Sequence, residues 1–163
     1  IEKLKLGTRI SITLDLEQTY WRTFLINCIL FPDVVDFIEL LKSKGIITAN
    51  ITDLTAQIQF RKLVYFGLDE FFDYVVTSEE AGEDKPGNKP FELAIQKVEV
   101  DPDSIWMIGD DIVNDIYGAH KMGMKKIQKV HQGVSTKEFE NCKPDFSFEN
   151  YSDIINMFNK IIG

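Results

Sequence analysis

Short apolar stretches rich in β-branched residues alternate along this chain with longer stretches of helical periodicity. This alternation predicts five strands, at residues 10–14, 46–51, 73–77, 105–108 and 124–130, and a short edge strand at residues 146–148. It predicts helices at residues 32–44, 54–66, 89–98 and 112–122, and from residue 150 onwards. Strands that alternate with helices form a parallel sheet covered on both faces. We therefore expect an α/β fold, a three-layer αβα sandwich around a Rossmann-like parallel sheet of about five strands.

The composition limits the class of protein. With 163 residues and a hydrophobic fraction of 44%, the chain suits one globular domain over residues 1–163. Its two cysteines are too few for a disulfide framework, which favours a cytoplasmic location. The net charge of -8 disfavours nucleic acid as a partner, because that binding needs clustered Lys and Arg. The longest apolar stretch, residues 24–31, is too short for a bilayer span, so no membrane partner is expected.

A pair of carboxylates follows the opening strand. The strand at residues 10–14 ends at Asp15, and Glu17 comes two residues later. In an extended segment these two side chains point the same way, and they repel each other unless a cation or a proton lies between them. The pair therefore favours a metal site or an acid/base pair, although a single carboxylate after a strand is more often a turn or capping residue.

Polar residues also follow the later strands. Thr52, Ser78 and Asp110 each come at or just after a strand end, and parallel sheets bind ligands at the carboxyl ends of their strands. Taken singly, each candidate also has an ordinary interpretation. Thr52 could cap a helix, and Lys85 could be a solvated loop residue. The acidic residues at the start of the next helix could simply suit its dipole: Asp110, Asp111 and Asp115. Their joint order is more informative than any one of them.

In that order the residues resemble the four motifs of the haloacid dehalogenase superfamily, the aspartate-nucleophile phosphohydrolases. Residues 15–19, Asp-Leu-Glu-Gln-Thr, are similar to the first motif, Asp-x-Asp-x-Thr. Thr52 resembles the second motif, and Lys85 resembles the third. Residues 109–111, Gly-Asp-Asp, together with Asp115 resemble the fourth. The chain is identified on these motifs as a member of the superfamily.

The resemblance covers residues 10–130 and implies a function. It implies hydrolysis of a phosphomonoester, from a small phosphorylated molecule or a larger substrate, through an aspartyl-phosphate intermediate on Asp15. The implied catalytic residues are Asp15, Glu17 and Lys85, and the implied phosphate-binding residues are Thr52, Asp53 and Lys85. Mg²⁺ is the implied cofactor, because hard oxygen ligands suit it. Its implied ligands are Asp15, the main-chain carbonyl of Glu17, Asp110 and Asp115, with Asp111 as the second choice.

The sequence departs from the family pattern in two places. The family carries Asp where this chain has Glu17, and a proton donor displaced by about 1 Å can cost on the order of 100-fold in rate. Only residues 20–31 stand where a helical cap domain is often inserted, so we expect no sizeable cap. Either the site is open, suited to a larger substrate or to a lid from a neighbouring subunit in a homo-oligomer, or cap residues are missing from the chain.

These departures leave other functions open. A catalytically weakened phosphate- or protein-binding module is the main alternative, and phosphotransfer is another. A dehalogenase would not need Asp110 and Asp115, and a dinucleotide-binding domain would show a Gly-x-Gly-x-x-Gly turn after its first strand. His120 and His131 have no partner at metal-ligand spacing, so the sequence favours surface positions for both.

Overall fold

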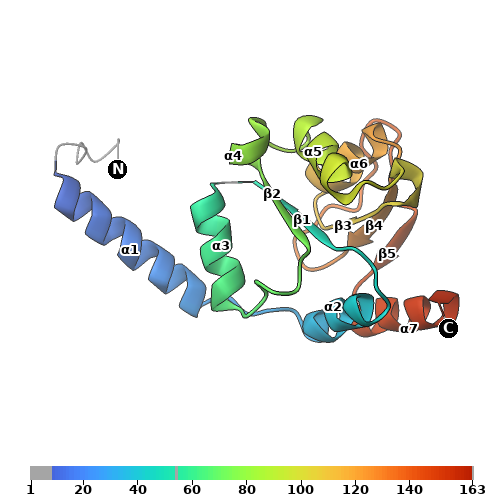
Figure 1. Ribbon diagram of the computed structural model, residues 1–163, viewed down its shortest axis with the longest axis horizontal. Coiled ribbons are helices and arrows are strands. Elements are labelled where there is room, and N and C mark those ends of the chain that lie inside the picture. The colour runs from blue at the N-terminus through green and yellow to red at the C-terminus, as the bar shows by residue number, and fades with distance from the viewer. Residues whose placement is uncertain (1–8, 54, 163) are drawn as a thin grey trace. The chain divides into compact units, whose positions relative to one another are not determined.

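The computed structural model describes residues 9–53 and 55–162. The chain divides into two compact units, Ile1–Leu30 and Phe31–Gly163. Helix α1 (Ile10–Ile26) belongs to the first unit, and the strands belong to the second (Figure 1). The single domain expected over residues 1–163 stays a prediction.

Helix α1 stands where the sequence predicts the opening strand, so that prediction is wrong. Ile10, Ile12 and Leu14 alternate with polar residues as in a strand, yet on the helix they are 78%, 39% and 49% exposed. A strand needs a neighbouring strand to satisfy its N–H and C=O groups, whereas a helix satisfies them within itself. Residues 20–26, predicted as part of a separate short segment, continue the same helix.

Within the described residues, five strands form two parallel sheets, and they include the predicted edge strand but not the predicted opening strand. Strand β1 (Ala49–Thr52) pairs with β2 (Tyr74–Thr77). Strand β3 (Trp106–Gly109) pairs with β4 (Lys125–Lys129), which pairs in turn with β5 (Phe146–Phe148). Within residues 9–53 and 55–162, no ladder of hydrogen bonds joins the two sheets. The parallel pairing confirms the predicted α/β class, and β1 begins slightly later than the sequence suggests.

The helices of the second unit follow the predicted order. They are α2 (Val34–Ser43), α3 (Ala56–Tyr65), α4 (Ser78–Ala81), α5 (Lys89–Val98), α6 (Gly118–Lys121) and α7 (Tyr151–Ile162), with a short 3₁₀ turn η2 (Pro102–Ser104) and a π-helical turn η3 (Ile112–Tyr117). The predicted helix over residues 112–122 is η3 followed directly by α6. Helix α4 is a single turn that the sequence does not predict. Leu54, the predicted start of α3, lies outside the described residues.

Two apolar clusters cover opposite faces of the strands. The first joins α2 and α7 to β4 and β5 through Phe37, Ile127, Phe148 and Ile154. The second joins α5 and α6 to β1 and β3: Phe91, Ala119, Met124, Ile51 and Met107. Neighbouring strand residues point to opposite faces, which is why Met107 and Ile108 pack into different clusters. The resulting helix, strand and helix layers (Figure 1) confirm the predicted three-layer sandwich.

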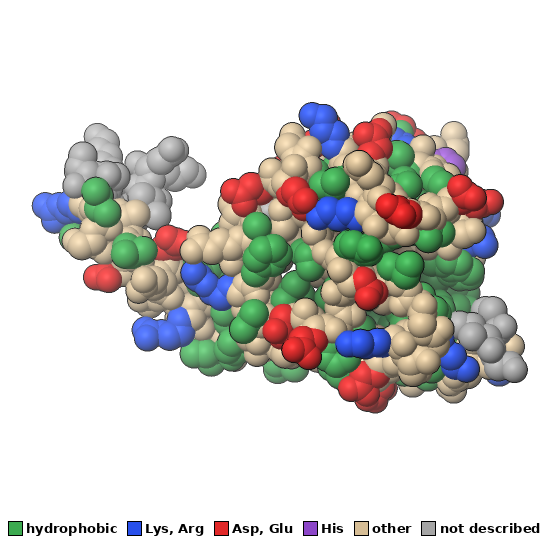
Figure 2. All heavy atoms as spheres, in the orientation of Figure 1, with side chains coloured by type: hydrophobic (Ala, Val, Ile, Leu, Met, Phe, Trp, Pro, Cys, Tyr) green, Lys and Arg blue, Asp and Glu red, His purple; other side chains and the backbone are tan. Residues whose placement is uncertain are grey.

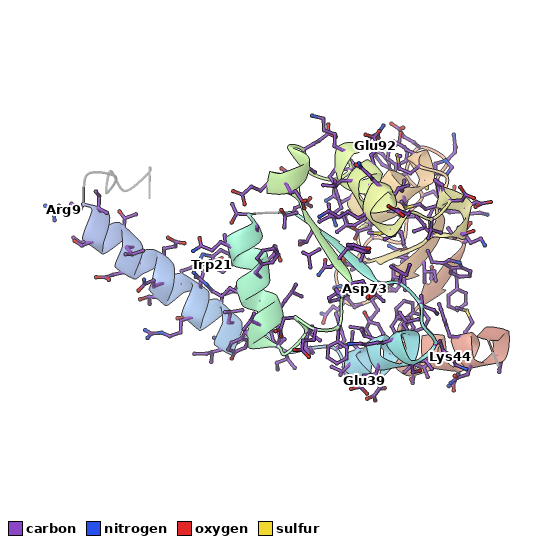
Figure 3. All side chains as sticks on the ribbon, in the orientation of Figure 1. Arg9, Trp21, Glu39, Lys44, Asp73 and Glu92 are labelled. Atoms are coloured by element: carbon purple, nitrogen blue, oxygen red, sulfur yellow. The ribbon has the colours of Figure 1, made fainter. Side chains whose placement is uncertain are left out.

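Asp73, labelled in Figure 3, links the beginnings of β1 and β2. Its Oδ2 accepts hydrogen bonds from the main-chain N–H of Thr48 at 2.7 Å and from the Thr48 hydroxyl at 3.1 Å. The main-chain bond from Thr48 is the chief reason why the pKa of Asp73 is lowered. A carboxyl group with a lowered pKa stabilises the fold above its unfolded-state pKa, and this contribution is lost as the pH falls through the folded-state pKa.

Replacing Asp73 with Ala should therefore lower the melting temperature at neutral pH. We expect a decrease of about 3 °C, because the carboxylate is exposed and contributes little more than its hydrogen bonds. The difference from the unchanged protein should shrink once the pH is low enough to protonate Asp73. Thermal unfolding followed by circular dichroism across pH tests this. Asp69→Ala, at an exposed position nearby, is the control, and an equal effect of both changes would contradict the prediction.

Candidate active site

Residues that follow β1, β2 and β3 meet at the carboxyl ends of these strands. Lys85, in the loop after β2, donates from Nζ to Oδ1 of Asp115 at 2.7 Å. The main-chain N–H of Lys85 donates to Oδ1 of Asp53 at 3.0 Å. Asp53 follows β1, and Asp115 lies on η3 after β3. Three segments far apart in sequence thus converge where parallel sheets bind ligands.

The Lys85 and Asp115 side chains form a largely buried ion pair. They are 11% and 8% exposed. The second carboxylate oxygen of Asp115 accepts from the main-chain N–H of Asp111 at 3.1 Å. A Cβ at Gly109 would lie 2.4 Å from that same oxygen, so glycine is needed for Asp115 to sit there. These contacts hold the pair in one geometry.

Asp110 and Asp111 have different surroundings although they are adjacent. Oδ1 of Asp111 accepts from the main-chain N–H groups of Val113 and Asn114, both at 2.8 Å, so Asp111 caps η3. The side chain of Asp110 is 52% exposed and contacts Nε2 of His131 at 3.1 Å. Asp110 is therefore the carboxylate of this pair that remains open to a ligand.

Thr52 and Asp53 line the β1 side of the site. The Thr52 hydroxyl donates weakly to the main-chain oxygen of Asp53, at 3.3 Å. The same oxygen accepts from Nε2 of the buried Gln59 at 2.7 Å. These bonds fix the backbone turn that brings the Asp53 carboxylate to Lys85. The structure therefore brings together Thr52, Asp53, Lys85 and Asp115 within one network.

Asp15 and Glu17 are not part of this network. Both are exposed on α1, in the unit Ile1–Leu30. The sequence places them side by side at a strand end, and the helix overturns that arrangement. Side chains two positions apart on a helix do not face each other. Their predicted roles therefore rest on the sequence motif and not on this geometry.

His131 and Gln128 also belong to the site. The sequence favoured a surface position for His131 and did not single out Gln128. His131 is only partly exposed, and its ring nitrogens face two acceptors, Oδ2 of Asp110 and the main-chain oxygen of Gln132, each at 3.1 Å. Nε2 of Gln128 donates to the main-chain oxygen of Asp110 at 3.0 Å. His131 directly follows the predicted strand 124–130. Because parallel sheets bind ligands at the carboxyl ends of their strands, its position could have marked it as a site residue.

Asp110 also influences a neighbouring tyrosine. Burial, followed by the negative charge of Asp110, raises the pKa of Tyr151. Tyr151 is therefore a neutral phenol at physiological pH. Its ring packs against Phe31, which in turn contacts the His131 ring with 5.3 Å between centroids. An aromatic wall thus supports the side of the site formed by Asp110 and His131.

The carboxylates suit Mg²⁺ in their chemistry but do not form a complete cage. Across the described part of the chain, no group of three or more His, Cys, Asp or Glu side chains is placed to hold a metal ion. Asp110 offers the hard oxygen donor that Mg²⁺ prefers. Asp115 and Asp111 use oxygens in bonds to Lys85 and to main-chain amides. A metal ion at Asp110 would need oxygen ligands in addition to these.

The sequence model of the haloacid dehalogenase-like hydrolases matches residues 12–129. The chain belongs to this family. The match begins before Asp15 and ends at the last residue of β4, so it includes Thr52, Asp53, Lys85 and Asp115 but not His131. The recognition made from the four motifs is confirmed.

Relatives of this haloacid dehalogenase-like chain include named phosphatases. Ribulose-1,5-bisphosphate 5-phosphatase of Halopiger xanaduensis is 36% identical over 114 residues, which are 70% of this chain and 48% of that protein. Glyceraldehyde 3-phosphate phosphatase of Pyrococcus furiosus is 34% identical over 115 residues, which are 71% of this chain and 45% of that protein. The chain thus spans about half the length of these relatives.

Solved structures of the family share the fold. A predicted phosphoglycolate phosphatase from Haemophilus somnus 129pt superposes with a TM-score of 0.76 and 28% identity, over 86% of this chain and 63% of that one. A haloacid dehalogenase phosphatase from Thermococcus onnurineus gives a TM-score of 0.70 and 26% identity, over 79% of this chain and 58% of that one. These likenesses agree with the three-layer architecture of the second unit.

Two further observations concern the helices and the surface. None of the described helices has the length and apolar character needed to cross a membrane. On the face that Figure 2 shows, acidic and basic side chains of the described residues are interspersed.

Proposed function

We propose that this chain hydrolyses phosphomonoesters of small phosphorylated metabolites, with Mg²⁺ as cofactor and Asp15 as the nucleophile. The observation that carries the proposal is the buried Lys85–Asp115 pair at the strand ends, held by Asp53 and Gly109. The printed names of two relatives, a ribulose bisphosphate phosphatase and a glyceraldehyde 3-phosphate phosphatase, support the substrate class. Because the chain spans about half the length of each relative, the activity of this chain is a proposal.

Lys85 is the group that attracts the phosphate. A phosphate dianion repels a carboxylate nucleophile, so the site must cancel charge before attack can occur. The Lys85 ammonium is compact, and its Asp115 partner fixes its position. The Thr52 hydroxyl and the amide N–H of Asp53 are proposed to donate to the phosphoryl oxygens. Together these groups would orient the phosphorus for in-line attack.

The metal ligands are proposed from the sequence motifs. Asp110 and Asp15 would supply carboxylate oxygens, and Glu17 its main-chain carbonyl. Asp115 would hold the ion or orient a water molecule near it, and Asp111 is the second choice because it already caps η3. When bound, Mg²⁺ would neutralise part of the negative charge of the phosphoryl group and of Asp15.

The proposed reaction has two steps, transfer of the phosphoryl group to Asp15 and hydrolysis of the aspartyl phosphate. An Asp15 oxygen forms a bond to phosphorus while the bond from phosphorus to the leaving oxygen breaks, and Glu17 gives that oxygen a proton. Water then attacks the aspartyl phosphate, Glu17 takes back a proton, and phosphate leaves with Asp15 restored.

A second candidate is a phosphate- or protein-binding module without efficient catalysis. The observation that favours it is the position of Asp15 and Glu17 on the exposed surface of α1. Glu17 in place of the usual Asp points the same way. Phosphotransfer to an acceptor other than water remains a further alternative. A cytoplasmic location and a homo-oligomer stay predictions of the sequence.

Phosphate release with and without Mg²⁺ tests the proposal. The protein should release phosphate steadily from para-nitrophenyl phosphate and from a panel of sugar and polyol phosphates. Chelation with EDTA should reduce the rate by about 100-fold or more, and added Mg²⁺ should restore it. Calorimetric binding of inorganic phosphate without any turnover would instead support the binding module.

A further inference from the structure

A pocket lies beside Asp110, between the beginning of η3 and the loop over residues 131–139. Its volume is about 670 Å³, which is within the range of small-molecule sites. Ile112, Val113, Val134 and Phe139 supply its apolar walls. The residues of this loop play no part in the proposed phosphoryl transfer. Asp110, the proposed metal ligand, is itself among the lining residues, so the pocket opens directly beside it.

Buried contacts fix this pocket relative to Asp110. Gln128 is 1% exposed, and its Nε2 donates both to the main-chain oxygen of Asp110 at 3.0 Å and to that of Ser135 at 2.9 Å. His131 adds the contact to the Asp110 carboxylate. One buried amide therefore ties the loop to the residue that would face the phosphate. The walls are placed before any ligand arrives, which reduces the cost of ordering the loop on binding.

The charges around the pocket argue against a second phosphate group. Three carboxylates line it, those of Asp110, Asp111 and Glu138, and Lys137 is the lysine among its lining residues. A second dianion would approach these three carboxylates with one lysine to offset their charge. A neutral group with hydroxyls finds both donors and acceptors there, in the Ser135 hydroxyl, Lys137 and Glu138, over an apolar base. The composition of the walls thus favours a neutral, hydroxylated ligand.

We propose that this pocket binds the leaving group of the phosphate ester, and that this group is a neutral hydroxylated carbon skeleton of triose to hexose size. The inference rests on the proposed function, because it places the scissile phosphate at Asp110 and Lys85. It selects monophosphates of sugars or polyols over bisphosphates. Val134, Ser135 and Glu138 are the residues that determine this selectivity.

Filling the pocket tests the steric part. Val134→Trp should raise KM for glycerol phosphate and glucose phosphate by about tenfold, as expected when a pocket wall excludes a ligand. KM for methyl phosphate, whose leaving group is too small to use the pocket, should change by less than about twofold. Val64→Trp, at a 63% exposed position on α3, is the control and should leave all three unchanged. An equal effect on methyl phosphate would overturn the proposal.

Removing a wall charge tests the electrostatic part. Glu138→Gln should lower KM for a hexose bisphosphate by about fivefold while that for glucose phosphate stays within about twofold. The matched control is Glu39→Gln, at an exposed position on α2 (labelled in Figure 3). A bisphosphate preferred over the monophosphate by the unchanged protein would overturn the assignment of a neutral leaving group.

A binding measurement separates this proposal from the proposed catalysis. The Asp15→Asn protein with Mg²⁺ is titrated with glycerol phosphate and, separately, with inorganic phosphate, and its amide resonances are followed by NMR. Glycerol phosphate should shift the amide resonances of residues 132–137, and inorganic phosphate should not. That result with no turnover by the unchanged protein would reject the catalytic proposal and keep the pocket. Identical shifts with both ligands, or none in this loop, would reject the pocket whatever the turnover.

Discussion

Asp15→Asn should lower the turnover of phosphate esters by about 1,000-fold or more, because the amide cannot form the aspartyl phosphate. Asp15 is exposed on α1, so the melting temperature should not change. The intermediate itself provides a direct measurement. Acid quenching of the unchanged protein during turnover should give a phosphorylated peptide that contains Asp15, and the variant should give none.

Two further variants complete the Asp15 experiment. Asp36→Asn, an exposed carboxylate in the first turn of α2, should leave turnover unchanged. Glu17→Asp should raise turnover by up to about 100-fold if the longer side chain misplaces the proton. Fast turnover by the unchanged protein, with no gain from Glu17→Asp, would show that glutamate at this position transfers the proton as well as aspartate does. Full activity of Asp15→Asn would remove Asp15 from the mechanism altogether.

Lys85→Met should damage both stability and activity. Its ammonium is the partner of Asp115 in a pair that is about nine-tenths buried, so the change leaves a buried carboxylate without its cation. We expect a loss of about 3 kcal/mol in the free energy of unfolding. Turnover should fall by about 1,000-fold, because the phosphate loses its cation. Urea unfolding and steady-state kinetics measure the two effects.

The double variant Lys85→Met with Asp115→Asn separates these effects. Removing the orphaned charge should recover most of the lost stability, to within about 1 kcal/mol of the unchanged protein, but no activity. Lys97→Met is the matched control, since Lys97 pairs with Glu80 at 2.7 Å but both side chains are more exposed. It should cost less than about 1 kcal/mol. Recovery of activity in the double variant would show that Lys85 acts only in folding.

The architecture of the second unit was largely predictable from local patterns. Three elements can be predicted from their own residues. These are α7 from its apolar stripe, α5 from the proline in its first turn, and β2 from its β-branched run. The polar residues Thr52, Lys85 and Asp110 follow strands whose parallel order forces their ends together. The location of these candidates at one edge therefore followed from sequence order alone.

The opening segment was not predictable in the same way. Ile10, Ile12 and Leu14 alternate as in a strand, but alternation shows only which side chains share a face. Whether a strand forms depends on a neighbouring strand to accept its hydrogen bonds, and that neighbour is distant in sequence. The helix needs no such neighbour. The local pattern therefore predicts a strand end at Asp15 and Glu17, whereas these residues lie on a helix because no described strand pairs with this segment.

The sequence by itself determined the α/β class, the order of the strands and longer helices in the second unit, and the family, because periodicity, helix ends and motif spacing are local properties of the chain. Only the tertiary structure decided that Asp115 pairs with Lys85, that Asp111 caps η3 and that Gln128 ties the 131–139 loop to Asp110. Each of these choices is a contact whose energy depends on burial and on partners from other segments. Side-chain identity alone contains neither.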